Sequence, residues 1–299
     1  MAVTPPVVLT IAGFDPSSGA GVTADIKTMA AHECFGVSCI TALTVQSTQG
    51  VCRVEAVDPK LIADTLEELA SDVIIEAIHI GMLANERVVA VVADFLEKSF
   101  PAKTGPPHVV LDPILKSSSG ADLLDAAGTR LLIERLFPLA ELITPNLDEA
   151  SQLTGKPVSN LEQMREAVTS LHSLGAANVV ITGGHLDKAI DLLSFTTVRG
   201  TGRSAALRTE QEVFKAERLQ SSSTHGTGCA FATALACHLA HGRGIPEAVL
   251  LSKVYVSAAI VNAHPLGKGV GPLHHLYRMN QQRRPSTVVS EREPTHSRN

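Results

Sequence analysis

Short apolar runs alternate with longer segments of helical period along most of this 299-residue chain. This rhythm is typical of parallel β-strands joined by crossover helices, because each strand is buried on both faces and each helix covers one face. It predicts an α/β fold with a doubly wound, mostly parallel sheet. We expect strands at Val7–Ala12, Val37–Val45, Ala77–Ile80, His108–Asp112, Leu142–Thr144, Asn178–Thr182 and Ile190–Phe195, and helices near Val22–Glu33, Lys60–Ser71, Glu86–Phe100, Leu123–Leu136, Leu147–Leu153, Leu161–Leu174, Gly228–Ala240 and Pro246–Ala263.

No linker or internal repeat divides the body of the chain, so residues 1–280 are expected to form one domain. Between Arg199 and Ser223 the sequence is polar and predicts short strands or an irregular connection. Residues 281–299 carry many charges and few apolar side chains, and we expect them to be a disordered tail.

The composition limits the class of protein. Apolar residues make up 44% of the chain and charged residues 18%, which excludes a disordered, collagen-like or coiled-coil protein. A net charge of −5 provides no general attraction to nucleic acid or to an anionic membrane. The five cysteines include no C-x-x-C pair, and neither a secretory leader nor an apolar run of about 18 residues is present. We therefore expect a cytoplasmic protein whose partners are small molecules.

Two nucleotide-binding motifs are matched only in part. Gly19–Ala24 fits G-x-G-x-x-A, but Gly19 lies seven residues beyond Ala12, and the next strand ends at Gln46 without the acid that binds a ribose. A dehydrogenase is therefore a distant alternative. A P-loop would need glycine where Ile26 stands, so another loop must hold any nucleotide phosphates.

The segment Thr224–Ala232, THGTGCAFA, opens a helix and has the features of an anion hole. Gly226 and Gly228 have no β-carbon, so the amides of Gly226, Thr227, Gly228 and Cys229 can converge at the positive end of that helix. Such donors stabilise charge on a phosphoryl group during transfer. The alternative is an ordinary helix start made of small residues.

Cys229 lies on the first turn of this helix. A helix N-terminus lowers the pKa of a thiol, so Cys229 is a candidate proton acceptor for a substrate hydroxyl, or a close neighbour that shapes the site. A buried cysteine with a packing role is the other interpretation.

Three polar residues follow predicted strands and could lie near a metal. Asn146 and Glu149 have capping-box spacing, which by itself predicts a helix cap. They also follow a strand at the sheet edge where α/β proteins bind ligands, and a carboxylate there can hold Mg²⁺ through water. Asp112 ends another strand and is either a loop cap or part of the same metal site.

Taken together, these residues resemble the hydroxymethylpyrimidine/phosphomethylpyrimidine kinases of thiamine biosynthesis, which belong to the ribokinase-like superfamily. The resemblance extends from about Val7 to about Tyr277. It rests on the order of the segments LTIAGFDPSSGAGVTADIKT, ITALTVQSTQGV, IHIGML, VLDP, LITPNLDEA, VVITGGH, THGTGC and GKGVGPLHH. It implies a three-layer sandwich with helices on both faces of the sheet, and phosphoryl transfer from ATP to 4-amino-5-hydroxymethyl-2-methylpyrimidine and then to its monophosphate.

The resemblance also implies roles for particular residues. Cys229 takes the place of the catalytic aspartate of related sugar kinases, in the GTGC anion hole. The substrate side comprises Gln46, whose amide suits an aminopyrimidine, together with Asp25, Met82 and Gly13. Asn146 and Glu149 match the magnesium and phosphate motif N-x-x-E, and Asp112 matches the D-P strand end, so all three are implied for the metal. Thr182 and Gly184 match a segment near the nucleotide.

Homodimers are common in the family, so a homodimer is expected here. Three positions depart from its usual pattern: Phe14 and Ser18 stand where GSDPSGGAG is common, and Lys116 is displaced from the usual position, now Ser118. Two further alternatives stay open. A vitamin B6 kinase would phosphorylate a similar hydroxymethyl group, and a ligand-binding protein of the same fold would have no turnover.

Overall fold

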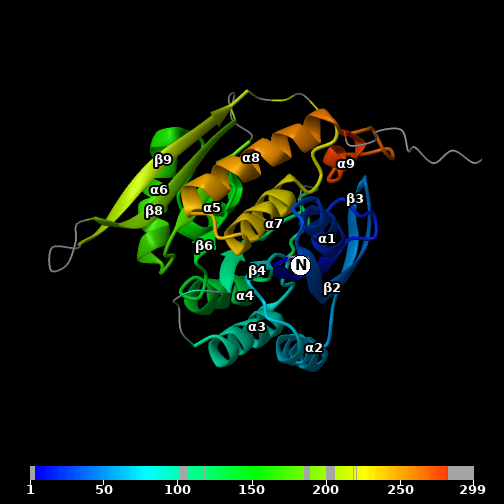
Figure 1. The fold of residues 1–299 in the computed structure, drawn as a ribbon, viewed down its shortest axis with the longest axis horizontal. Coiled ribbons are helices and arrows are strands. Elements are labelled where there is room, and N and C mark those ends of the chain that lie inside the picture. The colour runs from blue at the N-terminus through cyan, green and yellow to red at the C-terminus, as the bar shows by residue number, and fades with distance from the viewer. Residues whose placement is uncertain are drawn as a thin grey trace, which may run out of the picture.

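The computed structural model describes residues 4–101, 105, 107–117, 119–184, 189–199, 206–217, 219 and 221–281. Within these residues a nine-stranded sheet has the order β3-β2-β1-β4-β5-β6-β7-β8-β9 (Figure 1). The strands from β2 to β7 in this order run parallel, and β3, β8 and β9 are antiparallel to their neighbours. The strands are β1 (Val7–Phe14), β2 (Phe35–Ser47), β3 (Gly50–Ala56), β4 (Ala77–Ile80), β5 (His108–Leu111), β6 (Leu142–Ile143), β7 (Val179–Gly183), β8 (Ala189–Arg199) and β9 (Ala206–Ala216).

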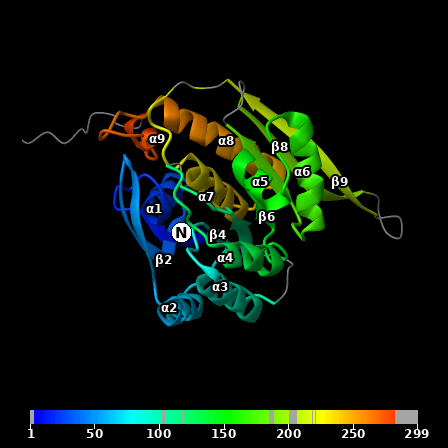
Figure 2. The ribbon, with the colours of Figure 1, turned by 180° about the vertical axis from the view of Figure 1, so that it is seen from behind.

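Helices cover both faces of the sheet, which confirms the predicted three-layer α/β architecture. One face carries α1 (Gly21–Ala31), α7 (Thr227–Ala240) and α8 (Ile245–Val261), which lie in front in Figure 1. The opposite face, in front in Figure 2, carries α2 (Pro59–Asp72), α3 (Glu86–Ser99), α4 (Ala126–Leu131), the π-helical turn η1 (Leu132–Leu136), α5 (Leu147–Thr154) and α6 (Leu161–Ser173). A short helix, α9 (Tyr277–Gln281), follows.

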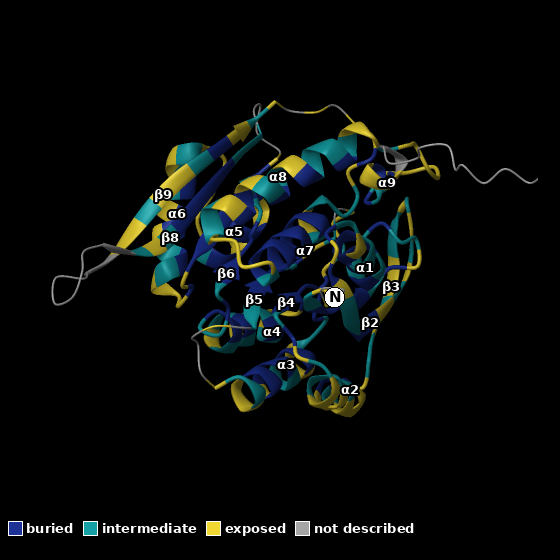
Figure 3. Ribbon diagram, viewed as in Figure 1, coloured by how far each residue is buried: buried dark blue, intermediate teal, exposed yellow. Residues whose placement is uncertain are grey.

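The two largest apolar clusters of the described residues lie on opposite faces of the sheet, because side chains alternate along the strands. In β1, Leu9 packs among residues from the α2 side of the sheet, while Val8 packs among residues of α1 and α7. Helix α7 is the most enclosed: residues 230–239 are all buried, and Figure 3 shows it dark blue at the centre of the molecule. An element held this firmly can fix the position of the loop that precedes it.

Most of the predicted elements are present, with boundaries shifted by a few residues. The main differences are local. The helix predicted from Leu123 begins only at Ala126, because the Asp125 carboxylate caps it by accepting from the Gly128 N–H. Strand β3 was not predicted because it lies at the sheet edge and alternates only weakly between buried and exposed residues. In the polar stretch after Arg199, β9 is a long strand paired with β8.

Residues 282–299, which include nearly all of the expected tail, lie outside the described residues. None of the helices in the described part of the chain is both long enough and apolar enough to cross a bilayer. The five cysteines are free thiols.

The topology brings several loops to one edge of the sheet. In the sheet, β1 lies between β2 and β4. The chain adds β2 and β3 on one side of β1, and then adds β4 and the later strands on the other side. Ligands of open α/β sheets bind outside the carboxyl ends of strands at such a point. The residues that follow β1, β4, β5 and β6 therefore define the place to look for a site.

Candidate active site

The loop before α7 is held against the loop after β1. Gly226 is the N-cap of α7 and has a φ of 82°, in the left-handed region that favours glycine. A β-carbon at this position would lie 1.9 Å from the carbonyl oxygen of Gly19. The first amides of a helix have no partner within it, so the N–H groups of Gly228 and Cys229 are left for a ligand, while that of Thr227 makes a long 3.4 Å hydrogen bond to the Thr224 carbonyl. The predicted anion hole is therefore sterically possible only with glycine at position 226.

The first turn of α7 also lies beside a buried carboxylate. A β-carbon at Gly228 would lie 3.6 Å from Oδ2 of Asp112, at the end of β5. Asp112 is 4% exposed and accepts a 3.1 Å hydrogen bond from Thr144, which follows β6. Burial raises the pKa of Asp112 to about 6, against the opposing effect of His79 and Thr144. The structure thus brings Asp112 next to the first turn of α7, where the anion hole is predicted.

Asn146 and Glu149 form the capping box that their spacing predicts. The Glu149 N–H donates to Asn146 Oδ1 at 2.9 Å, and the Asn146 N–H donates to Glu149 Oε2 at 2.8 Å. Burial and the neighbouring Asp112 raise the pKa of Glu149 well above the usual value, against hydrogen bonds from the Asn146 and Leu115 N–H groups. The cap uses one oxygen of each residue, Asn146 Oδ1 and Glu149 Oε2, and the metal role of both residues stays a prediction.

The donor set fits a hydrated divalent cation. Asp112 and Glu149 are two buried oxygen ligands whose charges disfavour each other, and a cation between them would relieve that repulsion. Mg²⁺ is usually held by one or two carboxylates together with water and substrate phosphates. Among the described residues there is no group of three His, Cys, Asp or Glu that could enclose a metal. This pair would thus hold Mg²⁺ only together with phosphate and water.

Cys229 is partly exposed, yet its surroundings oppose the ionisation that a helix N-terminus favours. Burial raises its pKa well above the usual value, and the carboxylates of Asp25 and Asp112 raise it further, while a hydrogen bond from the Gly21 N–H opposes them. The surroundings of Cys229 therefore favour the neutral thiol, and its role as a proton acceptor or as a neighbour that shapes the site stays a prediction.

Asp25, which the resemblance places on the substrate side, lies in the interior of the molecule. It is fully buried, and its two oxygens accept from the hydroxyls of Thr10, at 2.7 Å, and Thr233, at 2.8 Å. His79 Nδ1 lies 3.3 Å from the same carboxylate. Burial opposes the charge on His79, but Asp25 outweighs it and raises the pKa of His79. Asp25 therefore joins β1, β4, α1 and α7 beneath the site.

Met82 and Gly13 are neighbours at the ends of β4 and β1. Met82 is 7% exposed and packs with Ala42 and Leu123. A β-carbon at Gly13 would lie 2.9 Å from the Met82 sulfur, so the glycine makes room for the methionine. Two residues that the resemblance implies for the substrate side are therefore close neighbours.

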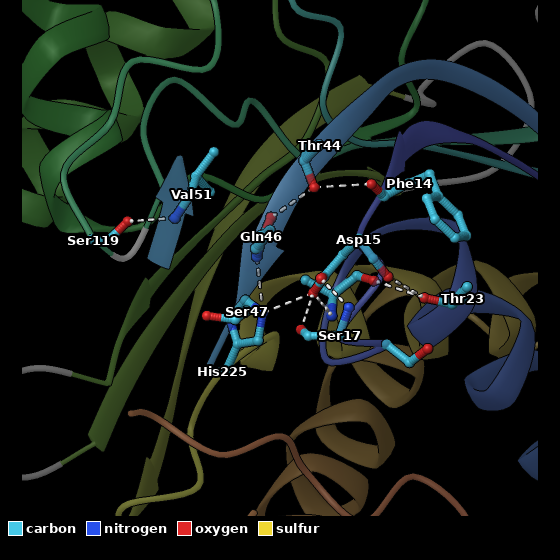
Figure 4. Close-up of polar contacts among 12 residues, drawn as sticks. Phe14, Asp15, Ser17, Thr23, Thr44, Gln46, Ser47, Val51, Ser119 and His225 are labelled. Atoms are coloured by element: carbon cyan, nitrogen blue, oxygen red, sulfur yellow. Dashed lines mark hydrogen bonds and ion pairs between the residues drawn. The ribbon is translucent and has the colours of Figure 1, made fainter. Parts of the chain in front are cut away.

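A chain of polar contacts that the sequence did not predict connects three loops. His225 Nε2 lies 2.9 Å from Asp15 Oδ2 and 3.2 Å from Gln46 Nε2 (Figure 4). Burial opposes ionisation of Asp15, but hydrogen bonds from His225 and Ser17 hold its pKa below the usual value. Gln46, which comes from a β-bulge at the end of β2, is thereby joined to the residue that precedes Gly226.

The β1–α1 loop itself is tightly folded around Asp15. Ser18 has a φ of 60°, in the left-handed region that favours glycine. Its N–H donates to the Asp15 carbonyl at 3.0 Å, and Lys27 Nζ donates to the Ser18 carbonyl at 2.8 Å. Local hydrogen bonds thus hold a conformation that a serine rarely adopts.

The segment of residues 267–271, GKGVG, contacts both the β2–β3 turn and the loop before α7. Gly269 N–H and Val270 N–H donate to Thr48, in the β2–β3 turn, and Gly271 accepts from the His225 N–H at 3.0 Å. A β-carbon at Gly269 would lie 1.9 Å from the Thr48 carbonyl oxygen. Hydrogen bonds of this segment therefore connect the β2–β3 turn to the loop before α7.

The expected nucleotide residues lie on the next strand. Thr182, in β7, donates its N–H to the Pro145 carbonyl at 2.9 Å and is therefore adjacent to the Asn146 cap. Gly184 is exposed at the end of β7, and residues 185–188 lie outside the described residues. Lys116, to which no role was given, forms an exposed 3.5 Å ion pair with Asp122.

Comparisons with known proteins agree with this arrangement. The family model described as phosphomethylpyrimidine kinase matches residues 15–274. The thiamine biosynthesis bifunctional protein ThiED of Geobacter sulfurreducens is 42% identical over 90% of this chain, which spans 52% of that longer protein. The hydroxymethylpyrimidine/phosphomethylpyrimidine kinase of Streptomyces coelicolor is 39% identical over 91% of this chain and 95% of its own length.

Solved structures agree as well. Phosphomethylpyrimidine kinase from Clostridium difficile has a TM-score of 0.70 and 36% identity over 85% of this chain and 99% of that one. Pyridoxal kinase from Staphylococcus aureus, in complex with AMP-PCP, has a TM-score of 0.80 and 31% identity over 92% of this chain and 95% of that one. The resemblance found in the motifs is confirmed, and the chain belongs to the phosphomethylpyrimidine kinase family.

Proposed function

We propose that this protein transfers the γ-phosphoryl group of ATP to the hydroxymethyl oxygen of 4-amino-5-hydroxymethyl-2-methylpyrimidine, and then phosphorylates the phosphate of the product. The observation that carries this proposal is the position of the first turn of α7, which opens beside Asp112 and faces the loop at Gly19. Hydrogen-bond donors and a cation site then lie next to each other, as phosphoryl transfer requires.

The chain's own residues would act mainly by positioning and by charge. The amides of Gly226, Thr227, Gly228 and Cys229 would donate to the transferred phosphoryl oxygens. Asp112 and Glu149 would hold Mg²⁺ with its water, and the cation would neutralise charge that develops on the phosphates. Gln46, Met82 and Gly13 would form the substrate side, with Thr182 and Gly184 near the nucleotide.

A neutral Cys229 suits the second transfer. The acceptor is then a phosphomonoester, and an ionised carboxylate at the position of Cys229 would repel it. Phosphoryl transfer proceeds through a loose transition state, so the hydroxymethyl group can lose its proton late and no strong base is needed at this position. The thiol would therefore shape the anion hole rather than accept the proton.

The test is an ADP-release assay with hydroxymethylpyrimidine, its monophosphate and pyridoxine as separate acceptors. We expect both pyrimidines to be phosphorylated with a higher kcat/KM than pyridoxine. A higher kcat/KM for pyridoxine would favour a vitamin B6 kinase, the candidate suggested by the similarity to pyridoxal kinase structures. Thermal stabilisation by a ligand without ADP release would identify a non-catalytic binding protein.

The proposal extends to a homodimer in the cytoplasm, as the family resemblance implies. The five free thiols fit a reducing compartment. Light scattering coupled to size-exclusion chromatography would measure the mass, and a monomer at micromolar concentration would contradict the first part.

A further inference from the structure

The hydroxyl of Thr44 indicates which group of the Gln46 amide faces it. Thr44 Oγ1 lies 3.0 Å from the Phe14 carbonyl oxygen and 3.1 Å from Gln46 Oε1, so its one proton faces two acceptors and can serve only one of them. The two orientations of an amide fill the same space, so hydrogen bonding decides between them. With the amide turned by 180°, the Gln46 NH₂ group would donate to Thr44 Oγ1, and Thr44 would donate to Phe14. Satisfying both contacts of Thr44 therefore requires the NH₂ group of Gln46 on its side.

His225 gives the same answer independently at the other end of the amide. Both oxygens of Asp15 act as acceptors: Oδ1 for the Ser17 N–H, and Oδ2 for the Ser17 hydroxyl and the Ala20 N–H. The Nε2 atom of His225, 2.9 Å from Oδ2, must therefore carry the hydrogen. This N–H also lies 3.2 Å from Gln46 Nε2, so two donors would face each other there. Turning the amide by 180° puts the Gln46 oxygen at this contact, where it can accept from His225.

The ring of His225 is held in place from two sides. A β-carbon at Gly19 would lie 2.3 Å from His225 Cδ2, so the ring occupies the space that the glycine leaves. The His225 N–H donates to the Gly271 carbonyl at 3.0 Å. His225 also directly precedes Gly226, the N-cap of α7. One residue thus connects the Gln46 amide to the predicted anion hole.

We propose that His225, held by Asp15, is a positioning residue that fixes Gln46 with its amide oxygen toward His225 and its NH₂ toward Thr44, and so selects the heterocycle. In this orientation one N–H and one oxygen lone pair of Gln46 remain for a ligand, in a fixed order. A 4-aminopyrimidine offers the complementary pair, an amine donor beside a ring-nitrogen acceptor. A 4-oxopyrimidine offers the reverse, because its carbonyl accepts and its ring N–H donates. This inference rests on the proposed function for the identity of the substrate.

The test compares kcat and KM for the 4-amino substrate and for its 4-oxo analogue, which keeps the hydroxymethyl group. We expect the wild type to prefer the amine by about 100-fold in kcat/KM, since a mismatched site leaves polar groups unpaired. His225→Ala frees the amide to turn, so the preference should fall to below about tenfold, through KM. Asp15→Asn should do the same, because an asparagine NH₂ can donate to His225 Nε2 and let that atom accept from Gln46.

A gain of activity toward the 4-oxo analogue is the decisive readout, because structural damage alone would lower both activities. Gln49→Ala is the matched control: Gln49 is an exposed glutamine in the β2–β3 turn, close to Gln46 in the sequence, and this change should leave the preference unaltered. An unchanged ratio in His225→Ala and Asp15→Asn, or an equal loss for both substrates, would overturn the inference.

Failure of the proposed function would be visible separately, as a wild type that releases no ADP with the 4-amino substrate. The amide orientation is then read directly from a neutron crystal structure of the wild type, which locates the deuterium atoms on Gln46 and His225. The same experiment decides the matter if the variants do not fold. Deuterium on the Gln46 atom that faces Thr44 supports the inference, and deuterium on the atom that faces His225 overturns it.

Discussion

A β-carbon on Gly226 would lie 1.9 Å from the carbonyl oxygen of Gly19, so the loop before α7 and the loop after β1 touch through backbone atoms alone. The two glycines are far apart in the sequence, and they meet only because α1 and α7 pack on the same face of the sheet. The contact fixes where the first amides of α7 point. It also makes a clear prediction about substitution.

Gly226→Ala should separate the two loops and displace the amides of the anion hole. A left-handed φ and a backbone collision cannot both be relieved by a local shift, so we expect kcat/KM for the first phosphorylation to fall by about 100-fold or more. Gly244→Ala is the control: Gly244 is the N-cap of α8, has a φ of −69° and has open space around it. Near-normal activity in Gly226→Ala would disprove the role of this contact.

Cys229→Asp should affect the two transfers unequally. A carboxylate among the α7 amides repels an acceptor that already carries a phosphate, but it does not repel a neutral alcohol. We expect the rate of the second transfer to fall at least about tenfold more than that of the first, whereas Cys229→Ser, which stays neutral, should change both to a similar extent. Single-turnover assays of each step would measure this, and equal losses in the aspartate variant would refute the charge argument.

Asp25→Asn should destabilise the fold. Both carboxylate oxygens accept hydrogen bonds in a fully buried place, and an NH₂ group would face a hydroxyl that now donates. We expect the free energy of unfolding to fall by about 3 kcal/mol. Urea titration would measure it, with Asp72→Asn, at the exposed end of α2, expected to change it by less than about 0.5 kcal/mol. A stable but inactive Asp25→Asn variant would instead indicate direct contact with substrate.

The pair formed by His108 and Glu141 should make stability depend on pH. His108 Nδ1 lies 2.6 Å from Glu141 Oε2, and this hydrogen bond raises the pKa of His108 above its ordinary value of 6.5. The raised pKa stabilises the fold fully below pH 6.5, and this contribution is lost as the pH rises through the folded-state pKa. The wild type should therefore exceed Glu141→Gln in stability by up to about 1 kcal/mol near pH 6 and by less at pH 9.

Urea midpoints measured across this pH range would show the effect. Glu162→Gln, an exposed change in the first turn of α6, should show a difference from the wild type that does not vary between pH 6 and 9. A gap between Glu141→Gln and the wild type that widens as the pH rises would have the wrong sign for this account.

Sequence patterns predicted the elements whose period is strong. The buried strands β1, β4 and β5 and the amphipathic helices α2, α3 and α6 lie close to their expected ranges, because their apolar residues recur with a single period. Strand β3, at the edge, has no such pattern. The sequence did predict the glycines of the THGTGC segment and the capping box at Asn146, because each of these features depends only on residues within one short segment.

Contacts between distant segments could not be found in this way. Asp15 and His225 are separated by 210 positions, and Asp25 and Thr233 by 208. Each pair depends on the packing of α1 against α7, which no local pattern specifies. The direction of the Cys229 pKa could not be predicted from the sequence either. The helix N-terminus is visible in the sequence, whereas the carboxylates that raise this pKa, Asp25, Asp112 and Glu149, come from distant segments.

The most direct test of the account is a crystal structure of the protein with Mg²⁺ and a non-hydrolysable ATP analogue. We expect a γ-phosphate oxygen within about 3.2 Å of the backbone nitrogens of Gly228 and Cys229, with the cation bridging the phosphates toward Asp112 and Glu149. A triphosphate bound away from the first turn of α7, with those nitrogens facing other groups, would contradict the central claim.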